Sequence, residues 1–308
     1  MQIKEKGVAW LRQLRLHMQP MYFINYSIGS AVAYTTSQRF DLGVYVLGYI
    51  CLFLGVLCAA LINDYYDYPT DCINKNAGFT AGTQILVEGK LGFKEVKVGI
   101  FVVLSLIPIF GYLLIRTAGD VSPWSTLFLL SFGTIFAVEY TAPPLKLCYK
   151  GIGEVIVATM TGPFPILFGY IPQIGTWTNS LPWLLSIPLF FAMFAAITLG
   201  TIPDYQADKT VSKKTISVIF GPRIAALVSL ALIAITALSC VLLWYLKILT
   251  GPVSITLFVV IPYALILSHA VIKLIKSDDF DRPINNILRV AVFNIMLIGL
   301  ILLLSLLW

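Results

Sequence analysis

The chain has 308 residues, of which 58% are hydrophobic and 12% are charged, and its mean hydropathy is +0.88. Soluble domains average about 45–50% apolar and about 25% charged residues, so this composition excludes a disordered chain, a collagen-like chain and an ordinary soluble enzyme. The net charge of +6 comes from 21 Lys and Arg residues against 15 Asp and Glu residues. Its placement matters more than its size, because basic residues set the topology of a membrane protein.

Nine apolar stretches of the sequence are about long enough to cross a membrane. A spanning helix needs about 20 apolar residues, because the hydrocarbon layer is about 30 Å thick and each residue rises about 1.5 Å. Backbone groups in lipid must bond within their own segment, which predicts helices rather than strands. The predicted spans are 19–37, 43–62, 97–115, 123–140, 153–171, 182–201, 223–246, 253–274 and 287–307. We therefore expect an all-α polytopic membrane protein with a single nine-helix domain, residues 1–308.

The basic residues predict how these spans are oriented. If the N-terminus is cytosolic, 18 of the 21 basic residues fall on the inner side, and only Arg39, Arg116 and Lys247 fall outside. Positive charge concentrated in cytoplasmic loops is the usual pattern of multi-pass proteins. We therefore expect a cytosolic N-terminus, with the inner membrane of a prokaryotic cell as the location. The mixed basic and apolar segment 7–17 is expected to be a short interfacial helix on the inner surface.

The first acidic cluster lies at the inner end of the second predicted span, where residues 63–71 read NDYYDYPTD. If the helix continues, the spacing i, i+3 and i+7 places Asp64, Asp67 and Asp71 on one face. Three like charges on one face need a counter-charge, since unpaired charges near the membrane are costly. Carboxylate and amide oxygens are hard ligands of the kind that Mg²⁺ prefers.

The second acidic cluster lies at the inner end of the sixth predicted span, where Asp204 and Asp208 are spaced i and i+4. Four spans separate the clusters, and an even number returns the chain to the same side, so both clusters can converge on one site. Acidic residues at a helix end can also form a solvated cap, which remains the alternative for either cluster alone.

Two facing acidic clusters suggest a site for a phosphorylated lipid. Mg²⁺ is typically held by one or two carboxylates together with substrate phosphates, and nearby Lys and Arg side chains can neutralise the remaining phosphate oxygens. Such a site at the membrane surface suits a diphosphate head attached to an apolar tail. Neutralising the leaving diphosphate would let its carbon–oxygen bond ionise to an allylic cation.

These residues resemble the UbiA superfamily of intramembrane prenyltransferases, whose patterns are NDxxDxxxD and a later DxxxDxxxGKxT. The first pattern is complete in residues 63–71, and the second has Ser212 in place of the usual Gly. The family has nine helices around a central cavity with the N-terminus inside. The resemblance implies Mg²⁺ as cofactor, with the following carboxylates as its ligands: Asp64, Asp67, Asp71, Asp204 and Asp208.

The inner loop 140–154, YTAPPLKLCYKGIGE, resembles a family loop in which a basic residue and tyrosines border the substrate pocket. Lys146 and Lys150 can alternatively serve topology and lipid-headgroup binding. The catalytic residues implied by the resemblance are Asp67, Asp71, Asp204, Asp208, Lys146 and Tyr140. The implied substrate-binding residues are Asn63, Arg15, Lys213, Lys214, Tyr149 and Thr215. Cytosolic cap loops are expected at 72–95 and 205–222, the first hinged at Gly78, Gly82, Gly89 and Gly92.

The resemblance also implies a reaction, in which an allylic cation from an isoprenyl diphosphate attacks an aromatic acceptor of the quinone-precursor type. Aromatic faces could stabilise the cation by about 0.5–2 kcal/mol each, although ordinary packing is the alternative for every one of them. The candidates are Tyr65, Phe132, Phe136, Phe164 and Phe168. The fifth predicted span contains Gly162-Pro163 and Pro165, and such a broken helix is expected to line a cavity. Residues 202–208 are most similar to the naphthoate-prenylating, menaquinone branch.

Two alternative functions remain open. A UbiA-type terpene cyclase would use the same diphosphate site and quench the cation within its own chain. A secondary transporter would more typically place its carboxylates near the bilayer midplane, between inverted repeats. The partners predicted are an isoprenyl diphosphate, a small aromatic acceptor and the lipid bilayer; no nucleic acid and no protein partner are predicted.

Overall fold

The computed structural model describes residues 3–74, 82–121, 123–280 and 284–308. Every regular element in these residues is helical, which confirms the all-α fold class. Six helices are long and apolar enough to cross a membrane, and a bent helix pair is a seventh candidate. The six are α3 (Leu42–Tyr66), α5 (Phe93–Ala118), α9 (Leu181–Gly200), α12 (Pro222–Tyr245), α13 (Val260–Ser277) with the preceding 3-10 helix η3 (Pro252–Val259), and α14 (Asn285–Leu307).

Two further predicted spans correspond to helices with a weaker membrane signature. The helix α2 (Gln19–Ser37) has 19 residues but carries many polar side chains, and α6 (Pro123–Glu139) has only 17 residues. The bent pair consists of α7 (Gly153–Thr161) and α8 (Pro163–Ile174). The described chain is therefore a polytopic helical bundle, while the count of nine spans and the cytosolic N-terminus stay predictions.

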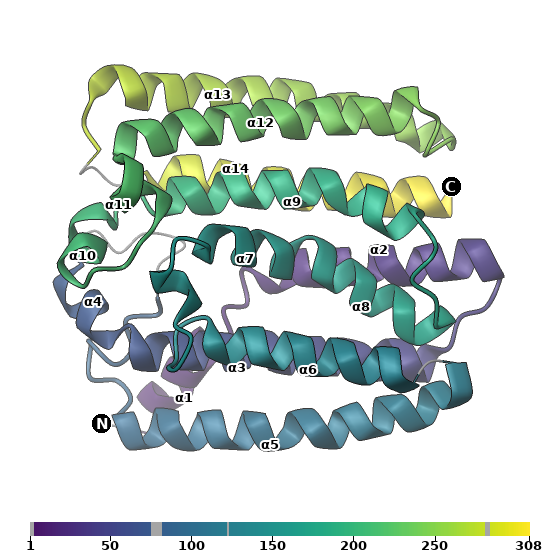
Figure 1. The fold of residues 1–308 in the computed structure, drawn as a ribbon, viewed down its shortest axis with the longest axis horizontal. Helices are drawn as coiled ribbons and strands as arrows, with labels where there is room; N and C mark the ends of the chain where they lie inside the picture. Colours follow the sequence, from purple (N-terminus) through teal and green to yellow (C-terminus); the bar gives the residue numbers. More distant parts are fainter. Residues whose placement is uncertain (1–2, 75–81, 122, 281–283) are drawn as a thin grey trace.

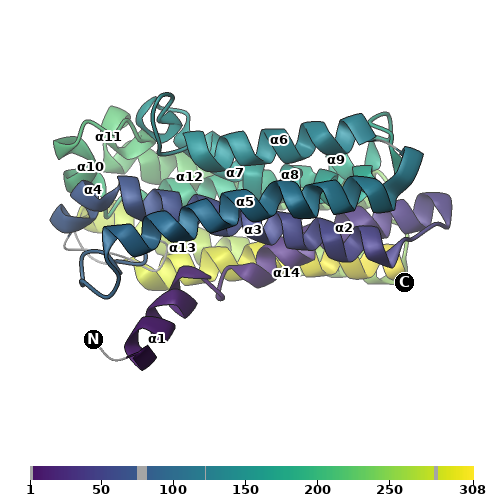
Figure 2. The same cartoon turned by 90° about the horizontal axis from the view of Figure 1, so that it is seen from below.

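The short helices gather at one end of the bundle, which we call the motif end (Figure 1). It holds α4 (Tyr68–Ile73), α10 (Tyr205–Thr210) and α11 (Ile216–Phe220), whereas the C-terminus lies at the opposite end. The N-terminal helix α1 (Ile3–Gln13) lies obliquely beside the motif end (Figure 2). Both acidic clusters thus lie at the same end, as the even number of intervening spans predicted.

The most enclosed membrane candidate is α9, which packs against α7, α12 and α14. Its side chains Leu185, Leu189 and Leu199 are fully buried. The helix is apolar around its whole circumference, which is expected of a helix surrounded by protein and lipid rather than by water. In contrast, most of α5 is not covered by other helices, so its apolar side chains are available to lipid.

Two breaks in the helices shape the interior. The chain bends by 40° between α7 and α8 at Gly162-Pro163, as expected from the proline, which has no N–H to continue the helical hydrogen bonds. A second break corrects an expectation: the helix through the first acidic cluster does not continue. Instead α3 ends at Tyr66, and Pro69 lies in the first turn of α4, where its missing N–H is tolerated.

Candidate active site

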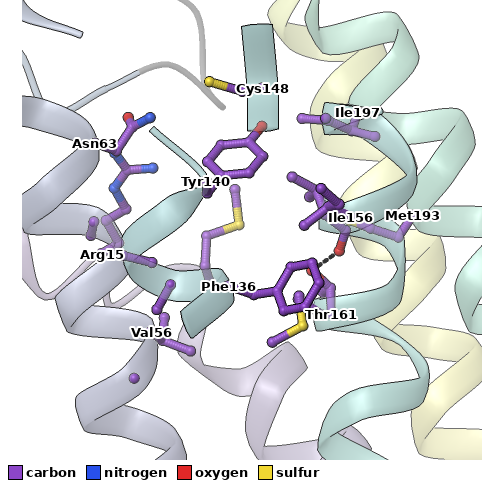
Figure 3. A pocket seen from close by; sticks show the side chains of 18 of the residues that line it. Arg15, Val56, Asn63, Phe136, Tyr140, Cys148, Ile156, Thr161, Met193 and Ile197 are labelled. Carbon is purple, nitrogen blue, oxygen red and sulfur yellow. Dashed lines mark hydrogen bonds between the residues drawn. The ribbon is translucent and has the colours of Figure 1, made fainter. Parts of the chain in front are cut away.

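A cavity of about 320 Å³ opens at the motif end and extends between α2, α3, α6, α7, α8 and α9. In Figure 3, Arg15 and Asn63 lie on one side of it, Met193 and Ile197 lie on the other, and Tyr140 lies between them. Both acidic clusters contribute to its lining. The predicted site residues that line the cavity are Arg15, Asn63, Asp67, Asp71, Tyr140, Asp204, Asp208, Lys213 and Thr215.

The carboxylate of Asp67 is the centre of the polar end of the cavity. It accepts hydrogen bonds from Asn63 Nδ2 at 2.9 Å and from the Tyr149 hydroxyl at 3.3 Å. The Lys213 ammonium lies 3.1 Å from Asp67 Oδ2 and 3.9 Å from Asp208 Oδ1, so one cation bridges the two acidic clusters. Burial lowers the pKa of Lys213, but the charges of Asp67 and Asp208 outweigh it and raise that pKa.

The buried carboxylate of Asp64 instead holds protein groups together. It accepts from Gln13 Nε2 at 2.9 Å, from Arg15 Nη2 at 3.2 Å, and from both the hydroxyl and the N–H of Thr83. These donors tie the end of α1 and the segment 82–92 to α3. The Asp64 side chain does not line the cavity among the described residues, so its predicted role as a metal ligand stays a prediction.

Two carboxyl groups at the cavity have too little positive charge nearby to balance their own negative charge. Burial, together with the nearby charges of Asp64 and Asp67, raises the pKa of Asp71 to about 7. Burial also raises the pKa of Asp208 to about 7, although the Lys213 ammonium opposes this rise. Both groups therefore carry a strong preference for an additional positive charge.

The remaining carboxylate, Asp204, is hydrogen-bonded to the residue that follows α4, just after the first acidic cluster. Its Oδ1 accepts from Asn74 Nδ2 at 2.7 Å, which links the end of α4 to the start of α10. Burial raises the pKa of Asp204, whereas this hydrogen bond lowers it. The segments that carry the two acidic clusters are thus linked by this hydrogen bond, in addition to the bridge made by Lys213.

The donor set fits a hard divalent cation that arrives with a phosphate. Among the described residues no three His, Cys, Asp or Glu side chains are already arranged as a metal site. A complete protein cage is unnecessary for Mg²⁺, which usually takes one or two carboxylates, several waters and substrate phosphates. The carboxyl groups of Asp71 and Asp208, both facing the cavity and poorly compensated, meet that requirement.

Besides Asp64, three predicted residues lie outside the cavity lining. Lys146 is exposed, with its Nζ 5.5 Å from the ring centroid of Tyr149. Tyr149 contacts the site through its hydroxyl bond to Asp67 and through its ring, whose centroid lies 5.8 Å from Lys213 Nζ. Lys214 is exposed beside the buried Thr215. A spacing in sequence cannot distinguish neighbouring lysines that point inward from those that point to solvent.

The predicted first cap loop is partly packed against the bundle. Gly78 lies outside the described residues, whereas Gly82 lies so near the site that a Cβ there would be 2.8 Å from Asp71 Oδ2. Ile85 and Leu91 are buried in a cluster with residues of α3 and α5. Gly89 has a φ of +65°, which favours glycine, and Gly92 precedes α5 with an extended backbone. The motion predicted for this loop stays a prediction. The second predicted cap loop, 205–222, contains α10 and α11 and ends at the first residue of α12.

The deeper wall of the cavity is aromatic. Phe136, Phe164 and Phe168 line it, and Phe132 packs behind them with its ring centroid 4.5 Å from that of Phe136. Tyr65, in contrast, packs against Phe93 with a centroid separation of 5.6 Å and does not line the cavity. Three of the five aromatic candidates therefore have the required location.

Sequence reasoning missed four polar residues of this site: Gln13, Asn74, Thr83 and Glu154. The first three donate hydrogen bonds to motif carboxylates. Glu154 lines the cavity, is only 3% exposed, and accepts a hydrogen bond from the Ile216 N–H at 2.6 Å. A carboxylate at the end of an apolar span was the available signal for Glu154, because such a group is costly to bury.

Comparison with known proteins is consistent with this site. The model of the UbiA prenyltransferase family matches residues 24–305. A digeranylgeranylglyceryl phosphate synthase of Methanobrevibacter smithii is 27% identical over 203 residues, a match that spans 65% of this chain and 66% of that protein. A 2-carboxy-1,4-naphthoquinone phytyltransferase of Synechocystis is 24% identical over 252 residues, 75% of this chain and 74% of that protein.

A solved structure has the same fold. The structure of a UbiA homologue from Archaeoglobus fulgidus bound to DMAPP and Mg²⁺ matches with a TM-score of 0.65 and 18% sequence identity. The match covers 96% of this chain and 98% of that one. The match therefore includes nearly all of the bundle.

Proposed function

Since the chain belongs to the UbiA prenyltransferase family, we propose that it transfers an isoprenyl group from an isoprenyl diphosphate to a small aromatic acceptor, with Mg²⁺ as cofactor. One observation carries this proposal. Asp67, Asp71 and Asp208 meet Lys213 at the polar end of a cavity whose deeper wall is apolar and aromatic. A donor with a charged diphosphate head and an apolar tail fits a cavity that is polar at its mouth and apolar deeper in the bundle.

The polar end would bind the diphosphate head. Lys213 and Arg15 supply positive charge there, and the Asn63 amide orients Asp67. When bound, Mg²⁺ neutralises the charge of the diphosphate and makes it a better leaving group. The carbon–oxygen bond then breaks with both electrons leaving on the diphosphate, and the rings of Phe136 and Phe164 face the apolar space where the allylic cation would form.

Two acceptor classes have support. The resemblance of residues 202–208 to the naphthoate-prenylating branch, and the similarity to a naphthoquinone phytyltransferase, favour an aromatic acceptor. The similarity to digeranylgeranylglyceryl phosphate synthases favours the hydroxyl of a glyceryl phosphate lipid as the second candidate. A terpene cyclase is the third, since it needs only the diphosphate site. We do not propose a transporter, because the family is one of enzymes.

The cellular setting is part of the proposal. The distribution of basic residues supports a cavity mouth that opens to the cytosol. The location that we propose is the inner membrane of a prokaryotic cell. Isoprenyl diphosphate would then enter from the cytosolic side with its tail between the helices.

A donor and acceptor panel tests the proposed reaction. We expect purified protein in lipid nanodiscs with Mg²⁺ to join isoprenyl diphosphates to 1,4-dihydroxy-2-naphthoate, as detected by mass spectrometry of the extracted products. Transfer only to geranylgeranylglyceryl phosphate would contradict an aromatic acceptor and favour the hydroxyl of a glyceryl phosphate lipid. Release of a cyclic hydrocarbon or alcohol without any acceptor would contradict transfer and favour the cyclase.

The raised pKa values of Asp71 and Asp208, each about 7, predict how pH affects stability without Mg²⁺. Because the folded protein binds more protons than the unfolded chain between about pH 4 and 7, stability should fall as pH rises through that window. Mg²⁺ should therefore raise the melting temperature more at pH 8 than at pH 6. Differential scanning fluorimetry with and without EDTA measures both slopes. An Asp71→Asn/Asp208→Asn variant should lose most of the pH slope, and an unchanged slope would contradict the assignment.

A further inference from the structure

A buried carboxylate outside both acidic motifs faces the same cavity. Within the described cavity lining, Glu154 is the acidic side chain that belongs to neither motif. It is the second residue of α7, where a negative charge is favoured by the helix N-terminus, yet it is only 3% exposed. Burying a carboxylate at the end of an apolar span is costly, so its retention calls for a reason.

The position of Glu154 along α7 is where the two ends of the cavity meet. Toward the motif end, its hydrogen-bond partner Ile216 directly follows Thr215, which lines the cavity together with Lys213. Deeper in the bundle, the next lining residues of the same helix are Ile156 and Thr161, which Figure 3 shows on the wall beside Phe136. Glu154 thus lies between the diphosphate end and the apolar end of the cavity. The allylic carbon would leave the diphosphate and bond to the acceptor near this point.

The hydrogen bonding of Glu154 fixes one carboxylate oxygen. Oε1 accepts from the Ile216 N–H at 2.6 Å, which connects α7 to the first residue of α11. A carboxylate has about four acceptor positions, so this bond leaves most of its capacity unused. The carboxylate has one further donor, its own backbone N–H at the start of α7, and within the described residues no other side chain is hydrogen-bonded to it. One oxygen is thus anchored, and the other is available to a ligand in the cavity.

Every acceptor considered for this site must lose a proton. When an aromatic carbon or a hydroxyl oxygen bonds to the allylic carbon, the C–O bond to diphosphate breaks with its electron pair, and one proton leaves the acceptor. The motif carboxylates are poorly suited to receive it. Asp67 already accepts from Asn63 and Tyr149 and pairs with Lys213. Asp71, Asp204 and Asp208 are expected to serve the cation, whereas Glu154 belongs to neither motif.

We propose that Glu154 is the general base of the transfer, with Oε2 taking the acceptor proton while the Ile216 N–H holds Oε1 in place. The proton then passes to water at the cavity mouth, so that donor and acceptor yield the prenylated product, diphosphate and one proton. This assignment rests on the proposed function, but it holds for an aromatic carbon and for a hydroxyl oxygen alike.

The variant Glu154→Gln tests proton acceptance at Oε2 separately from the hydrogen bond that holds Oε1. Glutamine keeps a carbonyl oxygen that can accept from the Ile216 N–H, but it has no basic oxygen. A general base contributes typically 10²–10⁴-fold, so product formation should fall by about 100-fold or more. The melting temperature should stay within a few degrees of the wild type, since the hydrogen bond at Oε1 is retained. The Mg²⁺-dependent affinity for geranyl diphosphate should stay within about twofold.

The readouts are prenylated product by mass spectrometry, binding of geranyl diphosphate, and melting temperature, each compared with Glu154→Ala. With an aromatic acceptor deuterated at the reacting carbon, Glu154→Gln should show a larger isotope effect than the wild type, because proton loss becomes rate-limiting. Product formation by Glu154→Gln within about threefold of the wild type would overturn the proposal and assign the proton to diphosphate or water. Loss of donor binding and stability to the same degree as in Glu154→Ala would overturn it in favour of a purely anchoring role. Failure of the wild type to transfer any donor would overturn this inference and the proposed function together.

Discussion

Asp67→Asn and Asp208→Asn are each expected to lower Mg²⁺-dependent turnover by about 10³-fold, because each removes a charge that the diphosphate site needs. Removing one electrostatic partner from a preorganised site typically costs 10²–10³-fold in rate. Asparagine preserves the shape of the side chain, so the fold should survive. In Asp67→Asn the Lys213 ammonium also loses its nearer partner, 3.1 Å away, and would compete less well for its present position. Steady-state rates with geranyl diphosphate over a Mg²⁺ titration measure the loss.

Asp41→Asn is the matched control for these variants. Asp41 caps the opposite end of α3, where its Oδ1 accepts from the Val44 N–H at 2.9 Å. Asparagine is as good a helix cap as aspartate, so both stability and turnover should be unchanged. Near-normal turnover in both Asp67→Asn and Asp208→Asn would refute the assignment of the cation site, whatever the control shows.

The sequence predicts the helices well because lipid imposes a single simple requirement. A long apolar run must be helical, so the prediction 19–37 coincides with α2, and 287–307 differs from α14 by two residues at its start. The bend at Gly162-Pro163 follows from the missing proline N–H. The break after Tyr66 follows from the same chemistry at Pro69, but the regular spacing of the acidic residues concealed it.

The site was predictable as far as one segment of chain determines it. Parity predicted both clusters at one end of the bundle, but the helical spacing did not hold, because α3 ends at Tyr66, before Asp67 and Asp71. Contacts between distant segments were not predictable, since helical periodicity shows which residues share a face but not what that face meets. Gln13 and Thr83 meet Asp64 across 51 and 19 residues, and Glu154 meets Ile216 across 62 residues. Lys213 and Lys214 are adjacent in sequence and were both predicted to bind substrate, yet of the two only Lys213 lines the cavity.

The close approach of α2 and α8 is another contact that the sequence did not reveal, and it supports the cavity wall. A Cβ on Gly29 would lie 1.8 Å from the Ile166 carbonyl oxygen, and one on Gly169 would lie 2.1 Å from the Tyr26 carbonyl oxygen. Ser30 Oγ donates to the Gly169 carbonyl at 3.0 Å across the same contact. Small residues allow helix backbones to approach closely in membranes, where burial of apolar surface gives little driving force.

Gly29→Ala should therefore destabilise the protein strongly, although alanine favours helices by about 1 kcal/mol over glycine. Relief of the overlap requires the backbones to separate, because the atom that it meets is a carbonyl oxygen rather than a flexible side chain. Overpacking costs typically 1–3 kcal/mol and occasionally more, and we expect a fall in melting temperature on the order of 10 °C. Gly55→Ala is the control: that residue is also within a long helix, and no atom lies within 4 Å of its added Cβ. Its melting temperature should be unchanged or slightly raised.

The reciprocal variant makes the interpretation specific to this helix pair. Gly169→Ala should cause a loss like that of Gly29→Ala, because its Cβ meets the Tyr26 carbonyl oxygen across the same contact. If both overlaps are relieved by one separation of α2 from α8, the double variant should lose clearly less stability than the sum of the two single losses. Additive losses would show that each alanine is accommodated locally, without moving α8. Because α8 carries Phe164 and Phe168 into the cavity, its separation should also lower turnover, whereas local accommodation should leave turnover nearly unchanged.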